Sequence, residues 1–382
     1  MAELTLQSSL QECARPAGPA RVGGTKLAAG GAAFLLLTVG VFWYQFHRLD
    51  AGSATPQWGE LRWRYLALIV LCLPVETMAS GLRIWVISRV LQPGLGFWTC
   101  IKAEWANAAI SMLTPSQSGG GPGQIYMLSR GGACVGTALT ISLLSFMGTM
   151  AALFCMGLYS LLISGLSDTG PLFLAAVWSI VLISGALGFA ATFPGLLRAA
   201  LAATSRAVWR VRGARRPLDD WWPPGQERTG AAVDRMGRVA ARLANIAYTY
   251  HGDVARFLRA GKMSFAWVCM LSFAFLFVRA FLPYLCLRFL GIEASSARHI
   301  VETQMALIFL IFFAPTPGGA GLAESASLAV MANIVPDGFA PHYNLLWRFS
   351  TVYLAATAGL VCLSRALGED ARNLLRHGRR PS

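Results

Sequence analysis

Nine ionisable residues lie within long apolar stretches of the chain or directly beside them. They are Glu76, Arg83, Lys102, Glu104, Arg130, Arg279, Glu302, Glu324 and Arg348. A charge in hydrocarbon is costly unless it is paired or hydrated, so such residues are candidates for a binding site or a proton path. Arginine and carboxylate side chains together suit ion pairing, proton transfer and the recognition of a charged headgroup.

Two clusters rich in glycine and proline lie next to several of these charges. The first reads LTPSQSGGGPGQ (Leu113–Gln124), and the second reads FAPTPGGAGLAE (Phe313–Glu324). Proline removes a backbone donor and glycine lets the chain reverse, so each cluster interrupts a helix. In lipid, such open backbone is tolerated only where protein or a watery cavity covers it. Interrupted segments in both halves of a membrane protein indicate a transporter site. The alternative is a pair of loops at the membrane surface.

A helix that restarts after such a break presents free N–H donors and partial positive charge, which suits a phosphate group. We predict that the glycines let backbone approach an anionic headgroup and that Arg130 and Arg348 add charge-assisted hydrogen bonds. Glu302 and Glu324 would meet a cationic group or a coupling proton. The predicted substrate-binding residues are Pro115, Gly119, Gly120, Gly121, Gln124, Arg130, Glu302, Pro317, Gly318, Gly319, Gly321, Glu324 and Arg348.

These charges also have purely structural interpretations. Glu324 could cap the helix that restarts after Gly321, and Arg348 could pair with Glu302 or Glu324. Glu76 and Arg83 lie two turns apart on one helix face, where they could pair only loosely. Lys102 and Glu104 are two positions apart and do not face each other, so we expect both at a hydrated membrane surface.

Motifs of soluble enzymes are missing from the sequence. It contains no H-E-x-x-H, no G-x-S-x-G and no phosphate-binding G-x-x-x-x-G-K-[ST]. The eight cysteines form no C-x-x-C pair, and most lie in apolar runs. We therefore expect no enzyme activity, no metal site and no cofactor, and we find no motif that would bind nucleic acid.

Composition places the chain in a membrane. Only 13% of its residues are charged, about half of the roughly 25% of a soluble domain. Arg130 and Asp168 enclose 37 uncharged residues, and Asp168 and Arg198 enclose another 29. Each run exceeds the roughly 20 residues that a membrane helix needs. The net charge of +14 is concentrated in cytoplasmic segments if the positive-inside rule holds.

The apolar runs predict an all-α polytopic membrane protein with about six transmembrane helices and two re-entrant hairpins, related as an inverted repeat. The expected helices are Leu27–Phe46, Tyr65–Ile87, Phe97–Leu113, Gly136–Ile163, Pro171–Phe193, Met263–Leu290, His299–Phe313, Leu322–Ile334 and Tyr343–Leu363. The hairpins over 97–124 and 299–334 would enter from opposite faces. Full spanning by these interrupted segments is the alternative.

The same pattern divides the chain into two membrane halves and three cytoplasmic parts. The ranges are a tail over 1–26, a half over 27–193, a basic interval over 194–262, a half over 263–365 and a basic tail over 366–382. Val233 to Tyr250 repeat apolar residues at the helical period, which predicts an amphipathic helix. It would lie in the membrane interface or pack on neighbouring helices.

The strings TPSQSGGGPGQIYMLSRGG (Thr114–Gly132) and APTPGGAGLAE (Ala314–Glu324), followed by the Tyr343–Arg348 helix, resemble the lysylphosphatidylglycerol synthetase transmembrane-region family. The resemblance covers about residues 27–365 and implies a flippase-like, multi-pass protein of the bacterial inner membrane. The positive-inside rule and the order of the spans predict both termini in the cytoplasm. The family motif positions are Pro115, Gly119, Gly120, Gly121, Gln124, Arg130, Pro315, Pro317, Gly318, Gly319, Gly321, Glu324 and Arg348.

In two-domain members, the resemblance implies, this module flips aminoacylated phosphatidylglycerol to the outer leaflet. Only 19 residues follow Leu363 here, so we expect a stand-alone member without the synthetase domain. Other stand-alone relatives are associated with isoprenoid-type lipids or lipid-linked glycans.

The expected function is therefore translocation of a phospholipid or a polyprenyl or isoprenoid-type lipid. The expected partners are anionic phospholipid or lipid-linked phosphate, a lipid-biosynthetic enzyme and a second copy of the chain. Two alternatives stay open, namely a secondary transporter of small solutes or ions and a non-transporting accessory protein of lipid biosynthesis.

Overall fold

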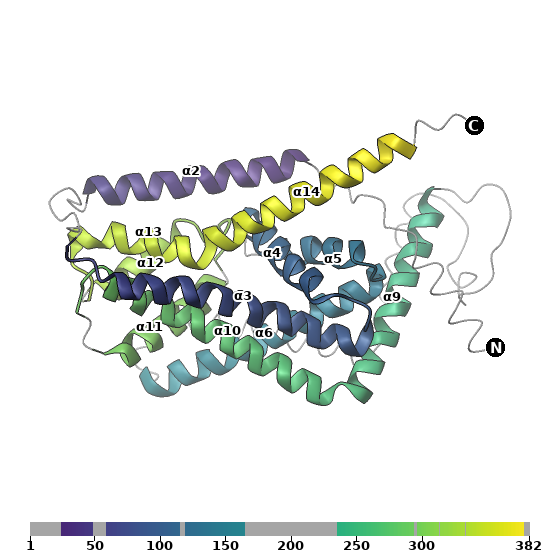
Figure 1. Cartoon of the computed structure of the whole chain (residues 1–382), viewed down its shortest axis with the longest axis horizontal. Coiled ribbons are helices and arrows are strands. Elements are labelled where there is room, and N and C mark those ends of the chain that lie inside the picture. Colours follow the sequence, from purple (N-terminus) through teal and green to yellow (C-terminus); the bar gives the residue numbers. More distant parts are fainter. Residues whose placement is uncertain are drawn as a thin grey trace, which may run out of the picture.

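The computed structural model of the chain describes residues 24–48, 59–114, 119–164, 235–293, 296–312, 314–332 and 334–377. All regular elements in these ranges are helical. The long helices run side by side along the longest axis of the molecule, and helix α9 crosses one end of them (Figure 1). The prediction of an all-α polytopic membrane protein is confirmed.

Four elements of the described chain are long and apolar enough to span a membrane. They are α3 (Trp63–Leu91), α6 (Val135–Ser164), α10 (Lys262–Phe289) and the run from Ala340 to Asn373. Helix α2 (Gly24–Arg48) lies beside them and contains the first predicted span. The predicted span Pro171–Phe193 lies outside the described residues, so the expected total of six spans stays a prediction.

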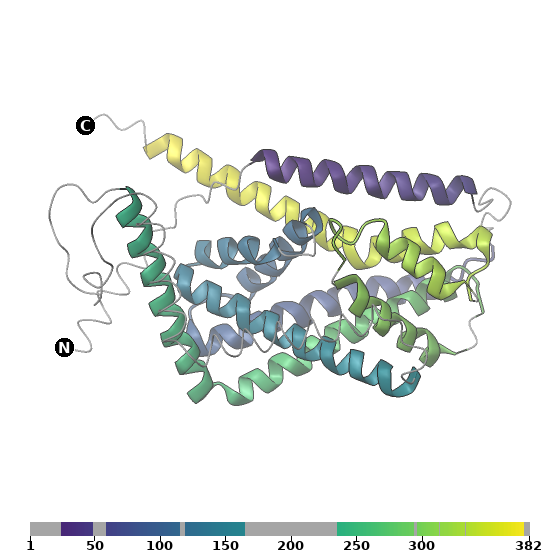
Figure 2. The same cartoon turned by 180° about the vertical axis from the view of Figure 1, so that it is seen from behind.

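Both interrupted segments fold as helical hairpins. The first consists of α4 (Phe97–Leu113) and α5 (Gly120–Arg130), and the second of α11 (Ala297–Phe312) and α12 (Leu322–Met331). The first hairpin starts and finishes toward the end crossed by α9, and the second toward the opposite end (Figures 1 and 2). The 17 residues of α4 reach about 25 Å, short of a hydrocarbon core of about 30 Å. The geometry is that of re-entrant hairpins.

The tips of the two hairpins meet. A Cβ atom added to Gly318 would lie 3.1 Å from the carbonyl oxygen of Met112, in the last turn of α4. Gly318, Gly319 and Gly321 have backbone φ angles of +57°, +71° and +82°, which residues other than glycine rarely adopt. The second glycine cluster therefore makes a turn that only glycine accommodates easily, and it presses this turn against the first hairpin.

The last span connects the regions of both hairpins. It consists of α13 (Ala340–Arg348), a π-helical turn, η3 (Phe349–Tyr353), and α14 (Leu354–His377), with a short 3₁₀ turn, η2 (Asp337–Phe339), before it. In Figure 1 α13 lies beside the second hairpin, and α14 continues past α4 toward the α9 end. A π-helical turn inside a span is uncommon and often marks a functional position.

Helix α9 (Arg235–Ala260) confirms the predicted amphipathic helix and extends it at its C-terminal end. Its side chains Tyr250, Val254 and Phe257 are buried, so one face packs on the bundle.

Trp98, at the start of α4, is 64% exposed, and Trp63, which begins α3 at the opposite end, is 51% exposed. Exposed tryptophans at both ends fit the aromatic belts of a membrane protein.

Near Trp63, Arg62 donates a 2.9 Å hydrogen bond to Glu293 in the connection between α10 and α11. This hydrogen bond and the charge of Arg62 hold the pKa of Glu293 below its ordinary value. Both side chains are accessible to solvent, so the pair ties two loops together with little effect on overall stability.

Two glycines in α14 allow the close contact between this helix and α4 to be tested. A Cβ atom at Gly359 would lie 1.9 Å from the carbonyl oxygen of Trp105, whereas none at Gly368 would meet a heavy atom within 4 Å. We expect Gly359→Ala to lower the melting temperature in detergent, because α14 must move away from α4. Gly368→Ala should leave it unchanged or raise it, since alanine favours helix by up to about 1 kcal/mol. Equal melting temperatures would contradict the close contact.

Candidate functional site: the buried charge pairs

Three ion pairs lie inside the helical bundle. Arg348 and Glu324 are 2.7 Å apart, and their side chains are 2% and 0% exposed. Arg83 and Glu104 are 3.3 Å apart, at 4% and 15% exposure. In the third pair, Arg279 of α10 and Glu76 of α3 are 2.9 Å apart, at 30% and 12% exposure. A charge removed from water as far as those of the first two pairs is stable only when it is paired.

The Arg348–Glu324 pair holds the turn of the second hairpin. Arg348 Nη2 donates a 2.8 Å hydrogen bond to the carbonyl oxygen of Gly318, and the backbone N–H of Gly321 donates a 2.7 Å bond to Glu324 Oε2. The arginine thus satisfies a carbonyl at the break, while the carboxylate caps the restarting helix α12. Both structural interpretations from the sequence, the Glu324 cap and the pairing of Arg348 with Glu324, are confirmed.

More buried polar side chains surround this turn. Asn344 Nδ2 donates a 3.3 Å bond to the carbonyl oxygen of Glu324, and Gln304 Nε2 donates a 3.3 Å bond to the Tyr343 hydroxyl. Asn344, Gln304 and Tyr343 are all buried. These hydrogen bonds connect α13 to α11 and to α12.

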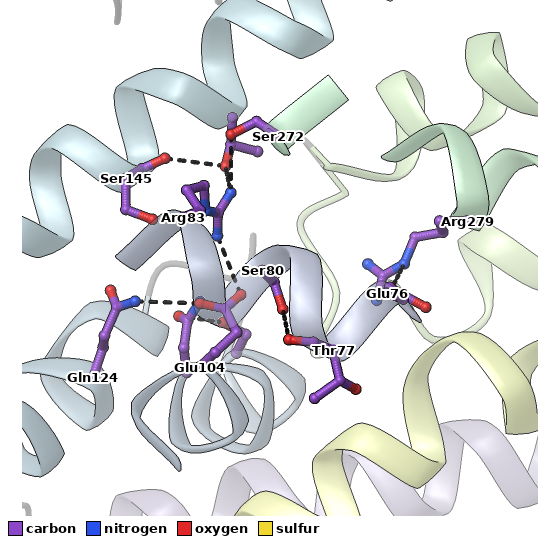
Figure 3. Close-up of polar contacts among 12 residues, drawn as sticks. Glu76, Thr77, Ser80, Arg83, Glu104, Gln124, Ser145, Ser272 and Arg279 are labelled. Carbon is purple, nitrogen blue, oxygen red and sulfur yellow. Dashed lines mark hydrogen bonds and ion pairs between the residues drawn. The ribbon is translucent and has the colours of Figure 1, made fainter. Parts of the chain in front are cut away.

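Arg83 lies at the centre of the second polar cluster (Figure 3). Its Nη1 donates to the Thr149 hydroxyl at 2.5 Å and to the Ser272 hydroxyl at 3.4 Å, and its Nη2 donates to Glu104 Oε1 at 3.3 Å. Gln124 Nε2 donates a 3.2 Å bond to the other carboxylate oxygen of Glu104. One arginine from α3 therefore links the first hairpin to α6 and α10.

The expectation that Glu104 is hydrated at the membrane surface is wrong. Its carboxylate accepts hydrogen bonds from Arg83 and Gln124 inside the bundle, because Gly81 lets α4 pack very closely against α3. A buried arginine in an apolar helix needs a carboxylate partner, and Glu104 lies on the next helix along the chain. That requirement is the sequence signal that could have identified the pair.

Glu76, two turns before Arg83 on helix α3, has a different partner. Arg279 Nε donates a 2.9 Å bond to Glu76 Oε1 (Figure 3), and Arg279 Nη2 donates a 2.8 Å bond to the carbonyl oxygen of Thr351. Thr351 lies in the π-helical turn η3. The loose pairing of Glu76 with Arg83 is therefore replaced by a direct pair across helices, which also anchors the irregular turn of the last span.

Two predicted site residues lie away from the meeting point of the hairpins. Arg130 ends α5 and pairs with Glu369 and Asp370 of α14, at the end of the molecule crossed by α9. Glu302, near the start of α11, pairs with Arg298 at 2.7 Å and accepts a 3.1 Å bond from the Tyr159 hydroxyl. The structure therefore does not bring Arg130 and Glu302 into one site with Arg348 and Glu324.

The glycines of the first cluster give α5 its close packing on α4. The N–H of Gly119 donates a 3.0 Å bond to Thr114 Oγ1. A Cβ at Gly120 would lie 1.9 Å from Asn107 Oδ1, and one at Gly123 would lie 2.8 Å from the Ala106 carbonyl oxygen, whereas Gly121 faces open space. Pro115 lies outside the described residues, and Pro317 is half-buried in the second turn.

This arrangement can exchange charge partners. Each pair holds one cation and one anion in fixed positions, and an entering phosphate could pair with the arginine if the displaced carboxylate takes up a proton. No group of three or more potential metal-ligating side chains occurs among the residues that the structure describes.

Comparison with known proteins gives one match. A protein-family model described as the lysylphosphatidylglycerol synthase TM region matches residues 30–359, which include both hairpins and these three ion pairs. No curated protein and no solved structure matches the chain.

Removing one partner of the most buried pair should be strongly destabilising. We expect Arg348→Met to lower the free energy of unfolding in detergent by about 3–5 kcal/mol, because the Glu324 carboxylate stays buried without its cation. The double variant Arg348→Met/Glu324→Gln should recover most of this loss, since the glutamine oxygen can still accept the Gly321 N–H. Arg62→Met, in the exposed pair with Glu293, is the matched control and should cost less than about 1 kcal/mol. If Arg348→Met matched this control, the pair would not hold the turn.

Proposed function

Because the chain belongs to the lysylphosphatidylglycerol synthase TM-region family, we propose that it is a lipid translocator of the bacterial inner membrane. The proposed cargo is an anionic phospholipid or a lipid-linked phosphate of the polyprenyl or isoprenoid type, moved without a covalent step. The observation that carries the proposal is the contact between two oppositely oriented re-entrant hairpins at Gly318 and Met112.

Paired hairpins of opposite orientation offer a route from either leaflet to the middle of the membrane. Transporters built from such repeats bind their substrate near the bilayer midplane, where interrupted helices supply polar backbone groups. Here the interrupted backbone at Gly318 and Gly321 is held by Arg348 and Glu324. An anionic headgroup that reaches this depth would find in Arg348 a cation to pair with in place of the Glu324 carboxylate.

The Arg83 cluster supports the same proposal at the first hairpin. Arg83, Glu104 and Gln124 connect α3, α4 and α5, while Thr149 and Ser272 connect them to the long helices α6 and α10. Movement of the first hairpin must therefore break these hydrogen bonds or move the neighbouring helices with it. We propose that Arg83 is a positioning residue, which holds the hairpin in the orientation that a headgroup can pass.

Lipid exchange in vesicles tests the function directly. Purified protein is reconstituted in phosphatidylethanolamine–phosphatidylglycerol vesicles that contain a trace of headgroup-labelled phosphatidylglycerol or of a labelled polyprenyl phosphate. Quenching of the outer-leaflet label by a membrane-impermeant reductant then measures transbilayer movement. We expect at least one lipid to move faster than in protein-free vesicles. If neither lipid moved faster while a soluble solute was taken up, the secondary-transporter alternative would replace the proposal.

The same assay should respond to Arg83. We expect Arg83→Gln to slow lipid movement about tenfold or more, equivalent to losing about 1.4 kcal/mol of stabilisation in the moving state. Arg62→Gln, in an exposed pair, should leave the rate unchanged. Melting temperatures of both variants show whether a slow rate reflects unfolding, and Arg83→Lys, which keeps the charge, should restore part of the rate. Wild-type exchange by a stable Arg83→Gln protein would exclude the positioning role.

A further inference from the structure

A groove opens between three helices at the end of the molecule opposite α9. It has a volume of about 560 Å³ and is lined by side chains of α6, α10 and α11. Ligand pockets for small molecules have volumes of about 300–1,000 Å³, so the groove is large enough to bind one. It is separate from the hairpin tips, because neither Arg348 nor Glu324 lines it.

The walls of the groove are apolar. Phe273, Phe277 and Phe281 follow one another at every fourth position of α10 and form one wall, about 12 Å long at 1.5 Å per residue. Met156 of α6 and Met305 of α11 contribute to the other walls. Both α6 and α10 are candidate membrane spans, so this wall lies at the depth of hydrocarbon rather than of water.

Polar groups gather at one end of the groove only. Tyr159, Arg298 and Glu302 line it, with Arg298 Nε 2.7 Å from Glu302 Oε1 and the Tyr159 hydroxyl 3.1 Å from the same oxygen. The Arg298 side chain is 75% exposed, while that of Glu302 is only 18% exposed. Arginine has five N–H donors, so Arg298 can bind an anion while it remains paired with Glu302.

The direction of each helix separates the polar end from the apolar end. Helix α11 begins at the end of the molecule opposite α9 and runs inward, so Arg298 and Glu302 lie nearer that end than Met305. Helix α10 runs the other way, so Phe281 lies nearer that end than Phe273. The groove therefore has a charged mouth and an apolar interior that extends along the bundle.

We propose that this groove is a lipid-binding site, in which one hydrocarbon chain lies along Phe273, Phe277 and Phe281 and the phosphate of the headgroup pairs with Arg298. A soluble anion would use the mouth but not the aromatic wall, whereas a lipid uses both. Only one part of this inference rests on the proposed function, namely that the lipid bound at the end of the molecule opposite α9 is the transported lipid. Binding itself is measurable without transport.

Photo-crosslinking locates the bound lipid. The full chain is reconstituted in phosphatidylethanolamine vesicles with a trace of phosphatidylglycerol that carries a diazirine in one acyl chain, and labelled peptides are identified by mass spectrometry after illumination. We expect labelling of the peptides that contain Phe273–Phe281 and Met156. Unlabelled phosphatidylglycerol should compete, and glycerol phosphate, which has the headgroup chemistry without the chain, should not.

Two variants with matched controls test the two parts of the site. Val301→Trp fills the groove and should reduce this labelling at least about fivefold, whereas Val361→Trp, on an exposed position of α14, should not. Arg298→Gln should weaken competition by phosphatidylglycerol about tenfold, the size expected for a lost charge-assisted hydrogen bond, and Arg372→Gln should have no effect.

The outcomes separate this inference from the proposed function. If wild-type labelling is spread evenly over all membrane-exposed peptides, or if Val301→Trp leaves it unchanged, the groove is not a lipid site, even where vesicle exchange proceeds. If the groove is labelled and competed for while wild-type exchange matches protein-free vesicles, the groove stands as a lipid site and the translocator proposal fails. Competition by glycerol phosphate alone would reassign the mouth to a soluble anion and overturn the lipid proposal.

Discussion

The ion pair between Arg348 and Glu324 is the interaction on which the architecture depends. A helix can be interrupted in the hydrocarbon region only if its free backbone groups find partners within the protein, since no water replaces them. At the second hairpin the guanidinium of Arg348 donates a hydrogen bond to the Gly318 carbonyl, and the Glu324 carboxylate accepts one from the Gly321 N–H. Because each side chain also neutralises the other, the break is satisfied in hydrogen bonds and in charge at once.

The other buried pairs extend this constraint through the bundle. Arg279 joins Glu76 to the carbonyl of Thr351 in the π-helical turn that directly follows α13, and Arg83 joins the first hairpin to α6 and α10. The last span is thus attached at its irregular turn to α10 and, through Glu369 and Asp370, to Arg130 of the first hairpin. Both hairpins are therefore attached to this span by charged contacts, in addition to the close packing of α14 on α4.

Much of this could be predicted from the sequence, and the rest could not for physical reasons. Uncharged runs identify spans directly, and the two Gly/Pro clusters identify the hairpins, because both signals are local. The cap by Glu324 is also local, three residues from Gly321. Pairing across helices is not: Arg83 finds Glu104, and Glu76 finds Arg279, only through the packing of α3 against α4 and α10. Arg130 follows the first break closely in the sequence, which predicts a position beside that break. In the structure it is the last residue of α5 and lies at the end of this helix away from the break.

Because the buried arginines already have carboxylate partners, an entering headgroup would have to displace a partner rather than fill an empty site. The arginines at both hairpins pair with carboxylates and donate to backbone or hydroxyl oxygens, so their charges are already compensated within the protein. Removing such a partner without replacement is costly, but the phosphate of the proposed anionic cargo could pair with the arginine if the displaced carboxylate takes up a proton. Under the proposed function, the internal pairs would keep the interior of the bundle neutral when no lipid is present.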